Sequence, residues 1–133
     1  MTTTVTCLKV DSLRKDGIDN LEQWMNIPNN VYTGRHGRVF IGKKSEGNIK
    51  VFTYPGSKWA NPYTLKEYPN IKKNLSMYVK YLFESGLIYQ IEELRGKNLG
   101  CYCQRHRASD GSPTCHAQVL ADLVEKCNHL IST

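Results

Sequence analysis

The chain has 133 residues, of which 40% are hydrophobic and 23% are charged, and its formal net charge is +6. This length predicts one domain, and the composition is that of a globular protein, which excludes an intrinsically disordered chain. The sequence has no apolar run of the roughly 18–20 residues that span a bilayer and does not start like a secretory signal, so we expect an intracellular protein, cytoplasmic or nuclear.

The first half of the chain predicts a short helix, a strand and a β-hairpin. Residues 1–30 have a β-prone start, followed by a polar segment in which three apolar side chains recur at helical spacing. A strand is expected at 30–33, closed by a glycine. Apolar segments at 38–42 and 49–54, separated by a polar turn, then predict a β-hairpin.

The second half alternates helices with a strand. An apolar stripe predicts a helix from Asn70 to Gly86, followed by a short helix at 87–94. A buried strand is expected at 98–103, and the last helix is expected to begin near Ser112, with this serine as N-cap and a proline after it. The order predicts a small single α/β domain: a short mixed sheet flanked by helices, with the β-hairpin beside it and sites at the ends of strands.

Metal-binding side chains gather where the predicted strand at 98–103 leads into the last helix. Cys101 and Cys103 are two residues apart, so on a strand their side chains point to the same face. Cys115 and His116 follow near the start of the helix, and the loop between can fold them back toward the strand. These four residues are the right number and type of ligands for tetrahedral zinc, and His106 in the loop could replace one of them.

Two interpretations of the same cluster need no metal. The positive end of a helix lowers the pKa of a thiol, so Cys115 beside His116 could be an activated nucleophile. Small cysteines also pack well where a strand meets a helix, which requires no chemistry at all. The other two cysteines, Cys7 and Cys127, have apolar neighbours and are expected to be buried thiols.

A basic turn follows the strand at 30–33. Gly34 lets the backbone approach a ligand closely, and Arg35 and Arg38 can hold a phosphate through paired N–H donors. A solvated basic hairpin is the alternative interpretation of these residues. The excess of positive charge favours an anionic partner, so we expect a nucleotide or nucleic acid and not a membrane.

The loop at 57–63 is unusually aromatic. Trp59 and Tyr63 could stack on a base, and Asn61 offers a donor and an acceptor to a polar ring, so we expect this loop, with Lys58, to contact a ligand. Packing of the aromatic rings into the core is the alternative.

Four motifs in fixed order resemble a family described as domain of unknown function 4326, known mainly from bacteria, phages and large DNA viruses. The family has a Gly-Arg pair, then Trp-Gly-Asn-Pro-Phe, then Leu-Arg-Gly-Lys-x-Leu-Gly-Cys-Trp-Cys, and finally a Cys-His pair before a Val-Leu helix. The corresponding residues lie at 34–35, 57–63, 94–103 and 115–120. The resemblance covers 31–124 and implies a family-like core preceded by an N-terminal extension at 1–30. The stretch between Arg35 and Trp59 is longer than the usual connection in the family, which implies an inserted β-hairpin near the site.

The chain departs from the family pattern at three positions. Ala60 replaces a glycine, which puts close approach of a ligand to the backbone there in doubt, whereas Tyr63 and Tyr102 are mild aromatic replacements. The resemblance implies a small α/β fold with a shared site, and it implies no activity. Its viral members add the host cell of a virus to the expected locations.

We therefore expect a protein that binds or processes a nucleotide or nucleic acid at one polar site. Gly34 and Arg35 would hold phosphate, Trp59 and Asn61 would hold a base or sugar, and the cysteine cluster would lie beside them.

If the protein is an enzyme, we expect a hydrolase or group transferase whose nucleophile is a zinc-bound water or the Cys115 thiolate, with His116 beside it. The alternative is a non-catalytic binding or accessory module of viral or phage type, in which the cysteines are structural.

Overall fold

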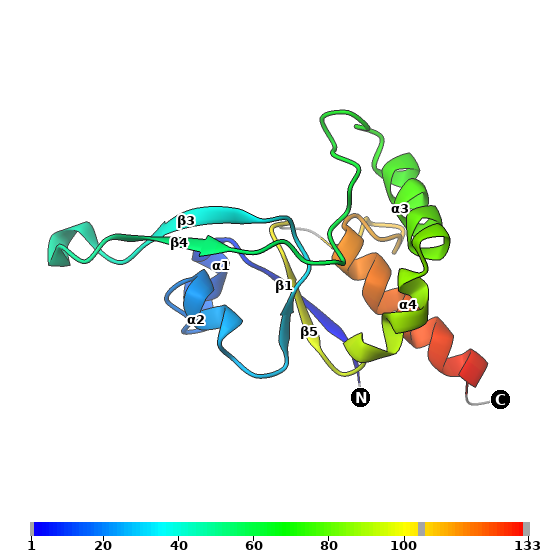
Figure 1. Ribbon diagram of the computed structural model, residues 1–133, viewed down its shortest axis with the longest axis horizontal. Helices are drawn as coiled ribbons and strands as arrows, with labels where there is room; N and C mark the ends of the chain where they lie inside the picture. The colour runs from blue at the N-terminus through cyan, green and yellow to red at the C-terminus, as the bar shows by residue number, and fades with distance from the viewer. Residues whose placement is uncertain (1, 104–105, 132–133) are drawn as a thin grey trace.

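A three-stranded parallel sheet forms the centre of the molecule (Figure 1). Its strands, in spatial order, are β1 (Thr4–Cys7), β5 (Asn98–Cys101) and β2 (Asn30–Tyr32). The computed structural model describes residues 2–103 and 106–131, and the side chains of 2–103 and 106–127. Because all three strands run in the same direction, their carboxyl ends meet at one edge of the sheet, where β5 ends at Cys101 and β2 at Tyr32.

Helices cover both faces of the sheet. On one face lie α3 (Ile71–Ser85), the 3-10 helix η2 (Leu87–Leu94) and α4 (His116–Ile131), and on the other lie α1 (Val10–Lys15) and α2 (Leu21–Met25). Neighbouring residues of the central strand β5 pack against the helices on opposite faces of the sheet. Leu99 is fully buried among the residues of α3, η2 and α4. Its neighbour Gly100 faces the opposite way, where Trp24 and Leu8 occupy the space that any larger side chain would need.

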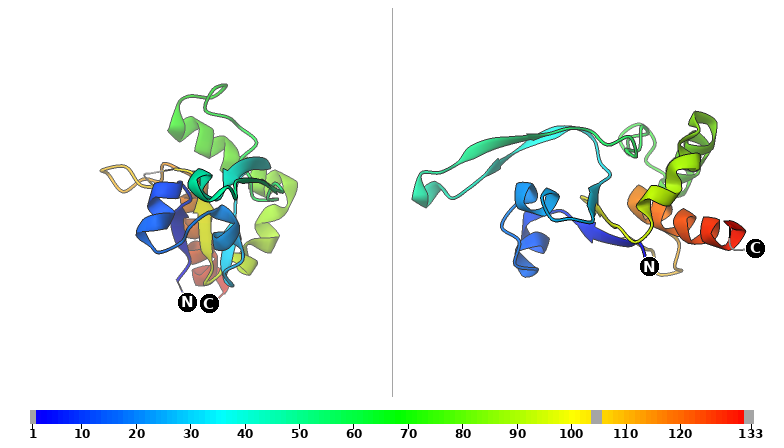
Figure 2. Two further views of the ribbon diagram at one scale, coloured as in Figure 1. Left: turned by 90° about the vertical axis from the view of Figure 1, so that its left-hand side faces the viewer. Right: turned by 60° about the horizontal axis from the view of Figure 1, so that its bottom comes forward.

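The hairpin is an arm that projects from the sheet (Figures 1 and 2). Its antiparallel strands are β3 (Gly37–Ile41) and β4 (Lys50–Tyr54), and a 3-10 turn, η1 (Lys44–Glu46), lies at its tip. Val39 and Phe52 face each other across the hairpin and pack against the cluster around Trp24. The predicted β-hairpin is thus confirmed, and its strands pair with each other rather than with the parallel sheet.

The two ends of α3 are where the sequence predicts them. The side chain of Asn70 accepts a hydrogen bond from the backbone N–H of Lys73, and Gly86 ends the helix with a φ of 82° that favours glycine. The small α/β fold with flanking helices is confirmed. The predicted N-terminal extension includes β1, which is an edge strand of the central sheet. No helix in 2–103 or 106–131 is both long and apolar enough to cross a membrane.

The prediction for the start of α4 is wrong. The helix begins at His116, after the backbone carbonyl of Cys115 accepts the N–H of Val119. Oδ1 of Asp110 accepts hydrogen bonds from both the backbone N–H and the hydroxyl of Ser112. These bonds hold the serine in a turn instead of at a helix N-cap. Cys115 takes the N-cap position instead.

Candidate metal centre and ligand cavity

Three cysteines meet at the carboxyl end of β5. Cys101 is the last residue of that strand, Cys103 lies two residues further on, and Cys115 is the residue before α4. Their Sγ atoms all lie within 4.8 Å of one another, and those of Cys101 and Cys115 are 3.7 Å apart. All three are free thiols. The sequence prediction that these cysteines come together is therefore confirmed.

His106 lies beside the cysteine cluster. Its Nδ1 lies 3.2 Å from Sγ of Cys115 and 3.8 Å from Sγ of Cys101. In a tetrahedral zinc site, bond lengths of about 2.3 Å to sulfur and 2.0–2.1 Å to nitrogen place two sulfurs about 3.8 Å apart and a sulfur and a nitrogen about 3.5 Å apart. The three distances fall around these values, so the three cysteines could hold a metal ion, and His106 lies within reach of two of them.

The loop before α4 brings His106 to the cysteines. The backbone N–H of Thr114 donates to the carbonyl of His106 at 2.9 Å, and Arg107 pairs with Pro113 in an isolated antiparallel bridge. The guanidinium of Arg107 also forms a 2.6 Å ion pair with Asp122 of α4. The loop is therefore folded back on itself and tied to the helix. Residues 104 and 105 lie outside the described part of the chain.

His116, the predicted fourth ligand, points elsewhere. Its Nε2 lies 2.6 Å from the carbonyl oxygen of Thr33, just after β2, and its ring meets Tyr78 edge to face. Because a carbonyl can only accept, this nitrogen carries the proton. The structure thus brings His106 and not His116 to the three sulfurs. The signal in the sequence is the Cys-x-x-His spacing of Cys103 and His106.

The cluster carries negative charge without a metal. Hydrogen bonds donated by Cys101 and Cys115 lower the pKa of the Cys103 thiol to about 3. Donation to Cys103 raises the pKa of Cys101. Burial lowers the pKa of His106, which keeps its imidazole neutral and its lone pair available near pH 7. A thiolate beside a neutral imidazole is the arrangement that metal binding requires.

A cavity of about 410 Å³ opens beside the cluster, at the carboxyl ends of β2 and β5. Its walls come from the base of the hairpin, the loop before α3, the end of β5 and the start of α4. They carry aromatic, amide, thiol and cationic side chains and, among the described residues, no carboxylate. These residues include Tyr32, Tyr54, Tyr63, Tyr102, Arg35, His36, Asn61, Asn74, Cys101, Cys103, Cys115 and His116.

Arg35 supplies the positive charge of the cavity. Its Nη2 donates to the backbone carbonyl of Asn61 at 2.6 Å, and in the described chain no carboxylate lies within ion-pair distance of its guanidinium. Gly34 precedes it, and a side chain there would overlap the ring of Tyr32, whose hydroxyl donates to the Arg35 carbonyl at 2.5 Å. The Gly-Arg motif thus wraps around a tyrosine and leaves the guanidinium at the cavity.

Two buried asparagines hold the loop before α3 in place. Asn61 donates from Nδ2 to Oδ1 of Asn74 at 2.7 Å and accepts the backbone N–H of Tyr63 at 2.9 Å. Asn74 donates in turn to the carbonyls of Tyr63 and Tyr68. Asn61 lines the cavity, but these bonds make it a support of the cavity wall. The sequence interpretation missed Asn74, a polar residue within the buried stripe of α3.

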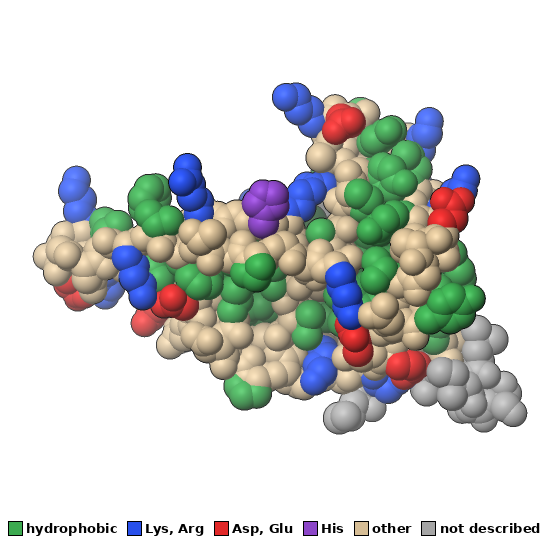
Figure 3. All heavy atoms as spheres, in the orientation of Figure 1, with side chains coloured by type: hydrophobic (Ala, Val, Ile, Leu, Met, Phe, Trp, Pro, Cys, Tyr) green, Lys and Arg blue, Asp and Glu red, His purple; other side chains and the backbone are tan. Residues whose placement is uncertain are grey.

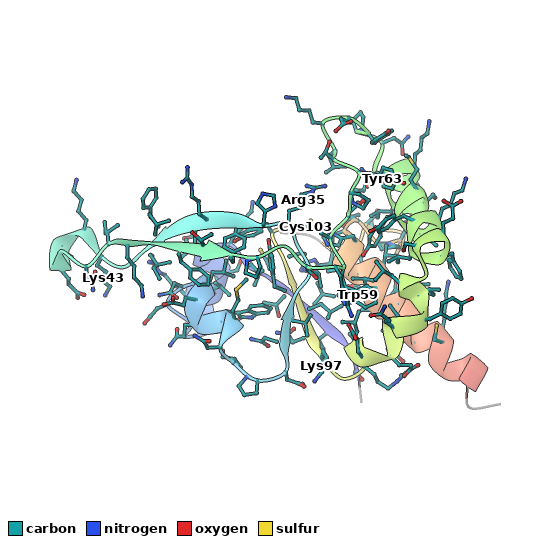
Figure 4. The ribbon with its side chains drawn as sticks, viewed as in Figure 1. Arg35, Lys43, Trp59, Tyr63, Lys97 and Cys103 are labelled. Atoms are coloured by element: carbon teal, nitrogen blue, oxygen red, sulfur yellow. The ribbon has the colours of Figure 1, made fainter. Side chains whose placement is uncertain are left out.

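Trp59 and Lys58 do not reach the cavity. Trp59 is only 2% exposed, is part of the helix-side core and donates from Nε1 to the Glu93 carboxylate at 3.2 Å. The ammonium group of Lys58 forms an ion pair with the same carboxylate at 2.7 Å. Figure 4 shows Arg35 and Cys103 together at the base of the hairpin, with Trp59 apart from them. The aromatic rings at the cavity are tyrosines.

Three tyrosines form one wall of the cavity, and the sequence interpretation assigned them no role there. The rings of Tyr32 and Tyr54 meet edge to face with centroids 5.3 Å apart, and the hydroxyls of Tyr54 and Tyr102 are 3.4 Å apart. Burial raises the pKa of Tyr32 and of Tyr102, so both phenols are neutral. For Tyr102, the available signal in the sequence was its position between Cys101 and Cys103.

Comparisons with known proteins place these motifs in a family. Residues 18–126 match the family described as "Domain of unknown function (DUF4326)". A protein of Acanthamoeba polyphaga mimivirus, "Uncharacterized protein R718", is 38% identical over 65 residues, which are 49% of this chain and 48% of the viral protein. The chain thus matches about half the length of this curated relative. No solved structure matches the chain. Because the family match covers most of the sequence and all of the described site, the chain belongs to the DUF4326 family.

Proposed function

We propose that this protein binds a nucleotide in the cavity at the ends of β2 and β5, beside a zinc centre formed by three cysteines and a histidine. The observation that carries the proposal is the cavity itself: it holds an arginine and aromatic rings and, in the described chain, no acidic side chain. Its volume of about 410 Å³ lies in the range of about 300–1,000 Å³ that is usual for small-molecule sites.

The roles within the cavity follow from charge and shape. A phosphate would accept hydrogen bonds from the Arg35 guanidinium, since the bond to Asn61 uses only one of its five N–H donors. A base would lie against the tyrosine wall, which offers ring faces and edges and neutral hydroxyl groups. The place also suits the proposal, because ligands of open α/β sheets bind at the carboxyl ends of the strands.

The zinc centre has a structural role in this proposal. Cys101, Cys103, Cys115 and His106 would be its ligands, and four protein ligands leave no position for a reacting water, as in structural zinc sites. The ion would fix the end of β5 to the start of α4, and with them one wall of the cavity. A structural zinc ion favours a non-catalytic binding module with structural cysteines over an enzyme whose nucleophile is a zinc-bound water.

Titration calorimetry with a nucleoside 5′-monophosphate and with the matching nucleoside tests the proposal. Arg35→Ala should weaken binding of the monophosphate about tenfold or more and leave binding of the nucleoside nearly unchanged, because a charge-assisted hydrogen bond contributes about 1.5–3 kcal/mol. Lys58→Ala is the matched control, since it removes a cation outside the cavity. Equal losses in both variants, or no phosphate-dependent binding by the wild type, would refute the proposal.

A second candidate is hydrolysis or group transfer on the bound ligand. The observation in its favour is that His116 lines the cavity while its Nε2–H donates to Thr33, which leaves Nδ1 as an acceptor for a proton. Candidate phosphate esters or glycosides incubated with the wild type and with His116→Gln would test it. Turnover lost in the variant, with ligand binding retained, would support an enzyme.

A further inference from the structure

The outer face of the hairpin is apolar and exposed, although nothing in the described chain packs on it. Phe40 and Val51 are cross-strand neighbours and are 75% and 51% exposed. Arg38 and Thr53 form the next pair on the same face, and both are exposed. The opposite face packs on the core through Val39 and Phe52. The ring of Phe40 is therefore exposed to solvent on the outer face of the hairpin, while the inner face packs on the core.

The hairpin segment also carries a net charge of about +4, a large share of the formal net charge of +6 of the whole chain. Residues 34–56 contain five of the 18 lysines and arginines and a single acidic residue, Glu46. One of the five, Lys50, is paired with Glu22 of α2 at 3.1 Å. Figure 3 shows basic and hydrophobic side chains alternating along the edge of the arm that faces away from α1 and α2.

The arm leads directly to the cavity. Arg35 and His36, just before β3, and Tyr54, at the end of β4, are part of the cavity wall. Figure 4 shows Arg35 at the base of the arm and Lys43 at its tip. Lys43 is eight positions after Arg35, which corresponds to about 26 Å of extended strand at about 3.3 Å per residue. A stacked single strand advances about 3.4 Å per nucleotide, so the arm is long enough for about eight nucleotides.

We propose that the outer face of this hairpin binds a single strand of nucleic acid, with a base stacked on Phe40 and phosphates held by Arg38 and the lysines of the tip. This proposal rests on the proposed function in one respect. If the cavity binds a nucleotide, that nucleotide is one residue of the strand bound along the hairpin. Aromatic rings alternating with cations are the usual means of binding single strands without sequence preference. A single strand fits better than a duplex, because a duplex hides the base faces that Phe40 requires.

Fluorescence anisotropy with a labelled ten-residue oligothymidylate tests the arm, and calorimetry with thymidine 5′-monophosphate tests the cavity on the same samples. Phe40→Ala should weaken binding of the oligonucleotide about tenfold. The double variant Lys43→Gln/Lys44→Gln should reduce the slope of log K against log salt by about 1.4, since each phosphate contact contributes about 0.7 for a single strand. Neither change should alter binding of the monophosphate.

The matched control variants remove an aromatic ring or two lysines from surfaces outside the hairpin. Tyr89→Ala deletes an 89% exposed aromatic ring on η2. Lys80→Gln/Lys126→Gln removes two exposed lysines of α3 and α4 and leaves the same net charge as the hairpin variant. Both controls should bind the oligonucleotide like the wild type, and thermal melting should show all variants folded, because every altered side chain is exposed.

The outcomes separate this inference from the proposed function. Oligonucleotide affinity that is equal in Phe40→Ala and Tyr89→Ala would overturn the inference, whether or not the monophosphate binds. Tighter binding of a matched duplex than of the single strand would also overturn it. Loss confined to the hairpin variants would support the arm even if the monophosphate did not bind, and in that case only the proposed cavity ligand would be wrong.

Discussion

Replacing His106 and His116 one at a time by glutamine separates the two candidate zinc ligands. Zinc-finger peptides with four ligands bind zinc with apparent free energies of about 10–16 kcal/mol, so one ligand of four contributes about 3 kcal/mol, or about a hundredfold in the dissociation constant. Nδ1 of His106 lies 3.2 and 3.8 Å from two cluster sulfurs. His116 donates to a carbonyl, and a glutamine amide can do the same. His106→Gln should therefore weaken zinc binding about a hundredfold, and His116→Gln by less than about threefold.

The assay is competition with a chromophoric zinc chelator, together with elemental analysis of reduced, untagged protein. The wild type should hold about one zinc per chain. Retention of zinc by His106→Gln together with its loss from His116→Gln would refute the assignment and restore His116 as the ligand. Absence of zinc from the wild type, with one unusually reactive thiol, would refute the metal centre altogether.

Three more predictions concern the walls of the site. Asn74→Leu should lower the free energy of unfolding by about 3 kcal/mol in urea denaturation, because three hydrogen bonds of this buried amide are lost at about 1 kcal/mol each. A loss below about 1 kcal/mol would contradict the role of Asn74 in holding the loop before α3. Gly34→Ala should reduce both nucleotide affinity and melting temperature, because the methyl group meets the ring of Tyr32; an unchanged variant would show that the turn can relax. Zinc affinity, measured by chelator competition, should rise about a hundredfold per pH unit between pH 7 and 9. The pKa of Cys103 is lowered to about 3, so this thiol is already ionised, whereas the pKa values of Cys101 and Cys115 are raised, so metal binding must release two protons. A pH-independent affinity would contradict this protonation pattern.

The sequence predicts the fold and the cysteine cluster well because both depend on local patterns. Helix α3 has a capping asparagine, an apolar stripe and a terminal glycine, and each of these signals acts within a few residues. Cys101 and Cys103 are two residues apart, and the structure brings their sulfurs together as this spacing predicts, although β5 already ends at Cys101. Their meeting with Cys115 depends on the loop before α4, in which His106 bonds to Thr114 and Arg107 pairs with Pro113.

The ligand cavity was harder to predict because it depends on long-range packing. Trp59 lies in a polar loop, and only the tertiary structure shows that the loop folds inward and buries the ring in the core. Tyr32 and Tyr54 belong to different sheets, and the sequence does not say that their rings meet. The side-chain bonds of Asp110 and Ser112 also outweighed the helix N-cap signal and moved the start of α4.

Mapping of a bound nucleoside 5′-monophosphate by NMR tests most directly the claim that the cavity at the strand ends is the ligand site. Titration into zinc-loaded, isotope-labelled protein should shift the backbone resonances of Gly34, Arg35 and Cys103, which line the cavity. The indole N–H of Trp59, held by Glu93 in the core, should stay unchanged. Shifts centred on Trp59 and Lys58, with the cavity residues unmoved, would contradict the claim.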